Sequence, residues 1–159
     1  MMPTVYIETT VPSYYYETRR SPMAAAWRAA TRAWWDDHGH GYELYTSRFA
    51  LAELAQAPRP KSTAALALMR NVSVLDEPRE LKSAADFYIM QRAMPEEAAG
   101  DAFHLGMASL HKMDFLLTWN CRHLANANKV RHLTVLNGRL GLPMPVITTP
   151  LMLMPEDET

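Results

Sequence analysis

Four polar residues from separate parts of the chain, Glu8, Glu53, Asp101 and Asn120, carry side chains that suit a divalent metal ion. Carboxylate and amide oxygens are hard ligands, of the kind that Mg²⁺ and Mn²⁺ prefer. Carboxylates that gather at one place repel one another, which raises their pKa values, and a divalent cation removes that penalty. The chemistry indicated is metal-assisted hydrolysis of a phosphodiester, in which one or two ions activate a bound water without a protein nucleophile.

The predicted secondary structure brings these residues to one edge of a sheet. Apolar runs predict strands at 5–7, 43–46, 72–75, 115–118 and 146–148. Helical patterns predict helices at 22–37, 47–57, 61–70, 80–94, 95–111 and 122–140, the last with an interruption near 126–128. Strands that alternate with helices predict an α/β fold, with a parallel sheet covered by helices on both faces. Glu8 and Asn120 follow strands, whereas Glu53 and Asp101 lie in the first two turns of helices. All four positions therefore meet outside the carboxyl ends of the strands, where open α/β sheets bind ligands.

Composition limits the classes of protein that need to be considered. The 159 residues are 48% hydrophobic, which predicts one domain, over 1–154, followed by a loose acidic tail at 155–159. Cys121 is the single cysteine, so an internal disulfide framework and a cysteine-based zinc site are excluded. No signal peptide and no apolar run long enough to span a bilayer is found, so we expect a cytoplasmic protein without membrane contact. With a net charge of −1, any polyanion must be bound by a local basic patch.

The segments around the four polar residues resemble the motifs of PIN-domain proteins, in particular VapC-type toxins of bacterial toxin–antitoxin pairs. These segments are VYIETTVPSYY, the acid in ALAEL, GDAFHLGMAS and FLLTWNCRHLANA, of which the last is the most specific. The resemblance covers nearly the whole chain. It implies a PIN-like three-layer α/β/α sandwich with a central parallel sheet of four to five strands, and Mg²⁺- or Mn²⁺-dependent ribonuclease activity on RNA. It also implies a homodimer and a cognate antitoxin that inserts near the active site.

Carried over by position, Glu8, Glu53 and Asp101 match the family's three acids, and Asn120 stands where a fourth acid is usual. Thr10 matches a hydroxyl or amide residue two places after the first acid. The resemblance implies that Asp101 and Glu8 hold the metal, that Glu53 orients it or its waters, and that Asn120 positions water or substrate. The first acid is usually Asp, and Asn120 supplies no charge. These departures support a second hypothesis, a PIN-fold binding or regulatory protein with weak or no nuclease activity.

A third hypothesis is a phospho-receiver domain, which also places an acidic Mg²⁺ pocket on a doubly wound sheet. Such domains resemble a pattern of adjacent acids after strand one, a phospho-accepting Asp after strand three and a Lys after strand five. Here those places hold a single Glu8, Asp76 and no lysine. The sequence also lacks a G-x-S-x-G elbow, a Walker P-loop and a G-x-G-x-x-G turn.

Several other groups of residues have two interpretations each. His104 forms a D-x-x-H pair with Asp101, although an interior histidine bonded to a neighbour is favoured. Two groups of basic residues could contact phosphate or simply be solvated. The first is Arg19, Arg20, Arg28 and Arg32, of which Arg19 and Arg20 are candidate substrate-positioning residues. The second is Arg122, Lys129, Arg131 and Arg139. One aromatic group could stack bases, although packing in the core or at a dimer surface is favoured: Tyr14, Tyr15, Tyr16, Trp27, Trp34 and Trp35.

Overall fold

Five parallel strands form one sheet in the order β3-β2-β1-β4-β5. The computed structural model describes residues 1–156. The strands are β1 (Thr4–Ile7), β2 (Glu43–Thr46), β3 (Ser73–Val74), β4 (Phe115–Leu117) and β5 (Val146–Thr148). All five were predicted from the sequence, to within one or two residues at each end. Positions 157–159 of the predicted acidic tail lie outside the described residues, and a domain boundary at residue 154 stays a prediction.

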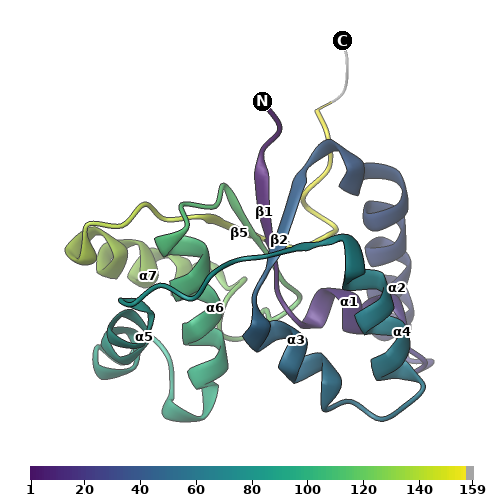
Figure 1. The fold of residues 1–159 in the computed structure, drawn as a ribbon, viewed down its shortest axis with the longest axis horizontal. Helices are drawn as coiled ribbons and strands as arrows, with labels where there is room; N and C mark the ends of the chain where they lie inside the picture. The colour runs from purple at the N-terminus through teal and green to yellow at the C-terminus, as the bar shows by residue number, and fades with distance from the viewer. Residues whose placement is uncertain (157–159) are drawn as a thin grey trace.

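Helices cover both faces of this sheet, as Figure 1 shows. On one side lie α1 (Thr10–Tyr15), α2 (Pro22–Ala33), α3 (Arg48–Ala55) and α4 (Lys61–Leu68). On the other side lie α5 (Leu81–Met90), α6 (Ala99–Leu110) and α7 (Ala127–Leu140). The predicted α/β/α layers are confirmed. None of the helices among residues 1–156 has the length and apolar character needed to cross a membrane.

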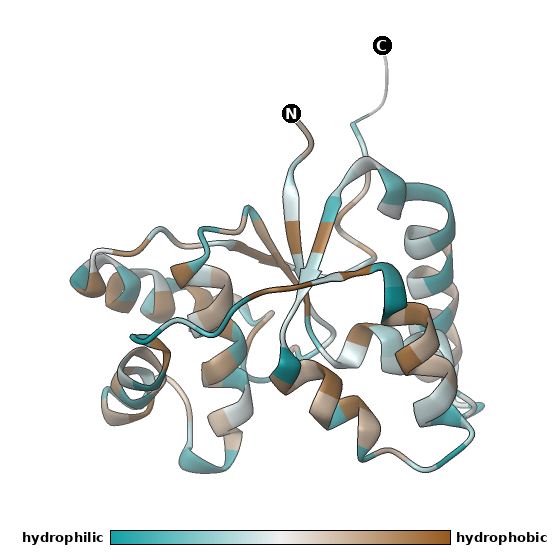
Figure 2. Ribbon diagram, in the orientation of Figure 1, coloured by the Kyte–Doolittle hydropathy of each residue, from teal (hydrophilic) through white to brown (hydrophobic). Residues whose placement is uncertain are grey.

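The central strand β1 joins two hydrophobic cores, one on each face of the sheet. Val5 and Ile7 pack with Trp34 and Leu54 on the side of α1 to α4, whereas Tyr6 packs into the core formed by α5, α6 and α7. The three strand residues have no exposed surface, and Figure 2 shows apolar colouring in the strands between the two helical layers. Burial on both faces is typical of parallel strands. It fixes the strand, and hence the position of the residue that follows it.

The strand order excludes the phospho-receiver hypothesis. In the doubly wound order of phospho-receivers, 2-1-3-4-5, the third strand lies beside the first. Here β3 is at the edge of the sheet, and β2 separates it from β1. Asp76, which follows β3, therefore does not follow a strand that neighbours the one leading to Glu8.

Two predicted helix boundaries were wrong because local hydrogen bonds end or start the helix elsewhere. The helix predicted over 122–140 begins at Ala127, within the predicted interruption, since the side chain of Asn126 caps it by accepting from the Asn128 N–H (3.0 Å). The helix predicted to reach residue 94 ends at Met90, and Arg92 follows it in the left-handed region with φ 60°.

The short helix α1 was not predicted. Pro12 lies within it, and a proline usually argues against a helix. Proline is tolerated in the first turn of a helix, where its missing N–H has no partner to lose. This helix turns the chain back directly after Glu8, so that Thr9 and Thr10 face the carboxyl edge of the sheet.

Candidate functional site

The four predicted site residues approach one another at the carboxyl edge of β1 and β4. Asp101 shows this best, because its pKa is raised from 3.8 to about 6, first by burial and then by the negative charge of Glu8. The positive charge of His104 and a hydrogen bond from Asn120 lower it, and the charge of Glu53 raises it again. Asp101 thus responds to both other acids and to the amide. Burial is the main cause of its raised pKa, and the like charges of Glu8 and Glu53 add to it.

Glu8 is buried, with 3% of its surface exposed, and hydroxyl groups hold its carboxylate. Its Oε1 accepts from the hydroxyls of Thr10 (2.5 Å) and Thr118 (2.6 Å), and its Oε2 accepts from the Thr10 N–H (2.9 Å). A buried carboxylate needs such donors, because charge removed from water is otherwise costly. Thr10 and Thr118 therefore orient the carboxylate of Glu8 by hydrogen bonds. Thr118 follows the end of β4, and it was not predicted from the sequence to be a site residue.

Glu53 is held through one of its two oxygens. Its Oε1 accepts from the hydroxyl of Thr9 (2.6 Å) and contacts Nε2 of His104 (2.6 Å). Partial burial raises the pKa of Glu53, but the hydrogen bond and charge of His104, together with the bond from Thr9, outweigh this and lower it. The carboxylate is therefore ionised and oriented, with Oε2 on the opposite side of the group.

His104 connects this acid to a chain of buried hydrogen bonds. Its Nδ1 lies 2.7 Å from the hydroxyl of Tyr6, which lies 2.7 Å from Oγ of Ser47, and Ser47 accepts from the Ala50 N–H (3.1 Å) at the start of α3. Burial raises the pKa of Tyr6, so its hydroxyl keeps its proton. Nε2 of His104 donates to the Glu53 carboxylate, and Nδ1 shares the second hydrogen bond of the ring with the Tyr6 hydroxyl. His104 is thus the bonded interior histidine favoured by the sequence.

Gly100, next to Asp101, lets the two helices that carry acids approach closely. A Cβ at this position would lie 3.2 Å from Oε2 of Glu53 and 3.3 Å from the ring of Phe49. Contacts at these distances are tighter than ordinary packing, so a larger residue would displace the carboxylate or the ring. The glycine therefore allows Glu53 on α3 to lie against the first turn of α6.

Asn120 uses its oxygen to shape the turn after β4. Its Oδ1 accepts from the backbone N–H groups of Arg122 (3.2 Å) and His123 (2.9 Å), which fixes the orientation of the amide. The amide NH₂ is then the group that bonds Asp101. Asn120 consequently supplies a donor to a carboxylate at the site, and its oxygen is already in use.

The donor set fits a hard divalent cation, although no ligand cluster is already formed. Among residues 1–156, no three His, Cys, Asp or Glu side chains stand in metal-binding proximity. Oε1 of Glu8 and Oε1 of Glu53 are already bound by hydroxyls and His104. The carboxylate of Asp101 and the two Oε2 atoms are the oxygens with fewest partners, and oxygen ligands of this kind suit Mg²⁺ or Mn²⁺.

The other predicted substrate residues lie apart from the acids. Arg19 pairs with Glu17 (3.0 Å) in the connection between α1 and α2, and Arg20 is exposed on the same connection. No hydrogen bond or ion pair within residues 1–156 joins either arginine to the three acids. Of the aromatic residues, Trp34 is fully buried and Trp27 stacks on Trp119 with ring centroids 4.5 Å apart, which favours a packing role.

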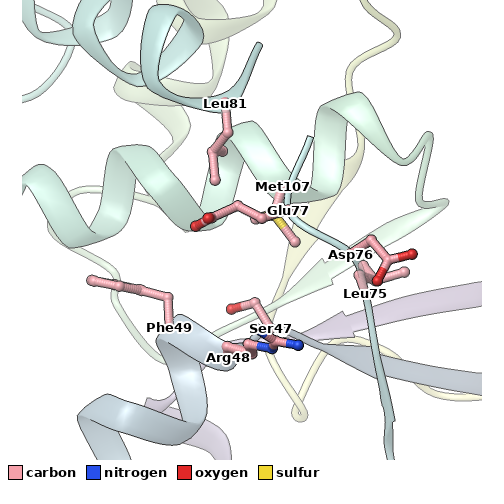
Figure 3. Close-up of a pocket in the computed structure, with 8 residues that line it drawn as sticks. All are labelled: Ser47, Arg48, Phe49, Leu75, Asp76, Glu77, Leu81 and Met107. Atoms are coloured by element: carbon pink, nitrogen blue, oxygen red, sulfur yellow. The ribbon is translucent and has the colours of Figure 1, made fainter. Parts of the chain in front are cut away.

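A hollow of about 260 Å³ lies next to the start of α3, on the side of β3 (Figure 3). Eight residues line it: Ser47, Arg48, Phe49, Leu75, Asp76, Glu77, Leu81 and Met107. None of the predicted site acids is among them. The hollow touches the site only through Ser47 and Phe49, which contact Tyr6 and His104 respectively.

Comparison with known proteins bears on the fold. No family model matches the sequence, and no curated protein matches it. Among solved structures, the chain resembles the crystal structure of FitAcB from Neisseria gonorrhoeae, with a TM-score of 0.52 and 14% sequence identity. The match covers 94% of this chain and 100% of that chain. Together with the parallel sheet in the order β3-β2-β1-β4-β5, this likeness confirms the fold expected from the sequence: the chain has the PIN-like three-layer α/β/α fold.

Proposed function

We propose that this protein is a divalent-metal-dependent ribonuclease. The proposal rests on the position of Glu8, Glu53 and Asp101 on or directly after three separate elements, with Oε2 of Glu53 only 3.2 Å from where a Cβ at Gly100 would lie, and the raised pKa of Asp101, about 6, supports it. Carboxylates arranged in this way are stabilised by a cation, and the PIN-like fold is one in which such acids serve phosphodiester hydrolysis. The activity needs no nucleophilic side chain.

Asp101, Glu8 and Glu53 would hold Mg²⁺ or Mn²⁺. When bound, the ion supplies a water of lowered pKa and stabilises the negative charge of the departing oxygen. The protein's own groups prepare the ligands. Thr10 and Thr118 fix Glu8, Thr9 and His104 fix Glu53, and Asn120 donates to Asp101. Because each of these partners is itself bonded or buried, the carboxylates are oriented before an ion arrives, which is how supporting groups tune a metal site.

We further propose that the enzyme is the toxin of a toxin–antitoxin pair, acting in the cytoplasm as a homodimer. The support is the resemblance of the sequence motifs to VapC-type toxins, together with the likeness of the fold to FitAcB. The partner would be a small antitoxin protein that covers the acidic edge. A gene for such a protein directly upstream would support this part of the proposal, and co-purification of the two products as a complex would test it.

Cleavage of RNA by the purified chain tests the enzymatic proposal. We expect cleavage of single-stranded RNA with Mg²⁺ or Mn²⁺, and none in EDTA or in Asp101→Asn. This variant keeps the shape of the side chain and its bond to Asn120, so loss of activity reports on charge. Undiminished cleavage by Asp101→Asn, or in EDTA, contradicts the mechanism.

A second candidate is a PIN-fold binding or regulatory protein with weak or no nuclease activity. Two observations favour it: Glu8 already accepts three hydrogen bonds, and Asn120 provides no charge at the fourth position. Calorimetry discriminates between the candidates. A Mn²⁺ isotherm that is lost in Asp101→Asn supports the enzyme, whereas the absence of measurable Mn²⁺ binding supports the binding protein.

A further inference from the structure

We propose that a basic hollow, lined by the chain segments that lead to Asp101 and away from Asn120, binds the phosphate backbone of the RNA substrate. The inference rests on the proposed function and specifies where the polyanion lies. The hollow, of about 610 Å³, lies between the α5–α6 connection and the β4–α7 connection. We define the basic hollow by four of the residues that line it: Arg92, Arg122, His123 and Lys129.

Both walls of the basic hollow adjoin site residues along the chain. Arg92 precedes α6, the helix whose first turn carries Asp101. Arg122 and His123 stand two and three residues after Asn120, and their backbone N–H groups donate to its side-chain oxygen. The proposal therefore places the scissile bond of the strand at the acids and a neighbouring phosphate in the hollow.

The charges in the hollow are uncompensated by the protein. Arg92, Arg122 and Lys129 face one acid, Glu96, and no ion pair among the described residues joins Glu96 to any of them. Lys129 donates to the carbonyl of Ala93 (2.8 Å), an uncharged partner. Burial lowers the pKa of His123, and the charges of Arg122 and Lys129 lower it further. Nδ1 of His123 is buried and has no hydrogen-bond partner within residues 1–156. An anion would relieve this concentration of positive charge.

Three of the four arginines in the other basic group of the sequence are already engaged within the protein. Arg19 pairs with the carboxylate of Glu17 (3.0 Å), and Arg28 donates to the carbonyl of the same residue (3.2 Å). Arg32 donates to the carbonyl of Tyr15 (2.8 Å). These contacts hold the α1–α2 connection. In the sequence, both basic groups had the same two interpretations. In the structure, the first group mostly makes contacts within the protein, so we assign phosphate binding to the basic hollow.

Arg92 also occupies a backbone conformation that favours glycine. Its φ is 60°, and it closes α5 with the bonds from the Arg92 N–H to Ile89 O and from the Ala93 N–H to Tyr88 O, both 3.0 Å. An arginine here costs stability relative to glycine. Lys112 closes α6 in the same way, with φ 55°, but lies outside the hollow. A comparison of glycine substitutions at Arg92 and Lys112 therefore distinguishes the loss of the Arg92 charge from the effect of a change in backbone conformation.

The test is the anisotropy of a labelled single-stranded RNA titrated with the full chain in EDTA, over a range of salt concentrations. Arg92→Gly and Arg122→Ala should each weaken binding several-fold and reduce the slope of log K against log salt by about 0.7, the value for one lost contact with a single strand. Arg92→Gly should melt at the same or a higher temperature than the wild type, which excludes unfolding as the cause. Lys112→Gly and Arg139→Ala, the matched controls, should bind RNA like the wild type.

Unchanged affinity and salt slope in both Arg92→Gly and Arg122→Ala overturn the assignment. So does displacement of the RNA by polyglutamate as effectively as by unlabelled RNA, because that result indicates an acidic protein as the occupant. Cleavage with Mn²⁺ is measured separately. Binding that depends on Arg92 without any cleavage supports the hollow and contradicts the nuclease. Metal-dependent cleavage by the wild type, with normal RNA binding by Arg92→Gly and Arg122→Ala, supports the nuclease and contradicts the hollow.

Discussion

Replacement of Asp101 by asparagine should stabilise the protein in the absence of metal. The pKa of Asp101 is raised to about 6 in the folded state, first by burial and then by Glu8, against an ordinary value of 3.8. Folding therefore favours the protonated carboxyl. Its contribution to stability is complete below about pH 4 and is lost as the pH rises through 6, where the ionised group lies near two other acids. The amide of the Asp101→Asn variant carries no charge at any of these pH values, so the variant escapes this loss.

The size of the effect follows from the shift. At about 1.4 kcal/mol per pH unit, a rise from 3.8 to about 6 sets a ceiling near 3 kcal/mol, which partial exposure to solvent reduces to about 1–2 kcal/mol. For a chain of this size, that difference raises the melting temperature by about 2–8 °C. Thermal unfolding in EDTA, from about pH 4 to about pH 8, should show the variant gaining on the wild type as the pH rises and matching it at the acidic end.

Saturating Mn²⁺ should reverse this order. An ion at about 100 times its dissociation constant stabilises the wild type by about 2.7 kcal/mol, whereas the variant lacks the central carboxylate and gains little. A variant that is no more stable than the wild type above pH 6 in EDTA would refute the reasoning, because it would show that burial and the neighbouring acids do not penalise the ionised carboxylate of Asp101.

Three further substitutions test how the acids are held. Thr118→Val removes a hydroxyl that donates to the buried carboxylate at the end of β1, and should lower the free energy of unfolding by about 1–3 kcal/mol in urea titrations. His104→Ala removes a partner of Glu53, and should weaken Mn²⁺ binding by about 10–100-fold in calorimetry. Gly100→Ala should also weaken Mn²⁺ binding, because its Cβ would lie 3.2 Å from Oε2 of Glu53, whereas Gly138→Ala, with no atom within 4 Å, should leave Mn²⁺ binding unchanged. If both His104→Ala and Gly100→Ala lose stability but bind Mn²⁺ with unchanged affinity, the proposal that Glu53 helps to hold the metal is contradicted.

The strands could be predicted because parallel strands buried on both faces appear as short apolar runs. Val5 and Ile7 face one core and Tyr6 the other, so the run at β1 is continuous and easily recognised. The edge at which the acids meet follows from the alternation of strands and helices alone. The helix ends were harder, since a single side chain such as Asn126 decides where α7 begins.

The supporting groups of the site were not predictable in the same way. Thr118 and Tyr6 contact Glu8 and His104 across about a hundred positions of sequence, and neither contact leaves a local pattern. The sequence indicated the amide at Asn120, but only the structure shows that its oxygen belongs to the following turn. Residue types thus indicate which groups could do chemistry, whereas long-range packing decides which atoms are available for it.

The location of a bound Mn²⁺ ion tests the central claim most directly. Anomalous diffraction from a crystal soaked in Mn²⁺ identifies the ion and the oxygen atoms around it. We predict an ion held by Asp101 together with Glu8 and Glu53. An ion held elsewhere, or no anomalous peak at this edge with Mn²⁺ in excess, would contradict the assignment of these three acids as a metal site.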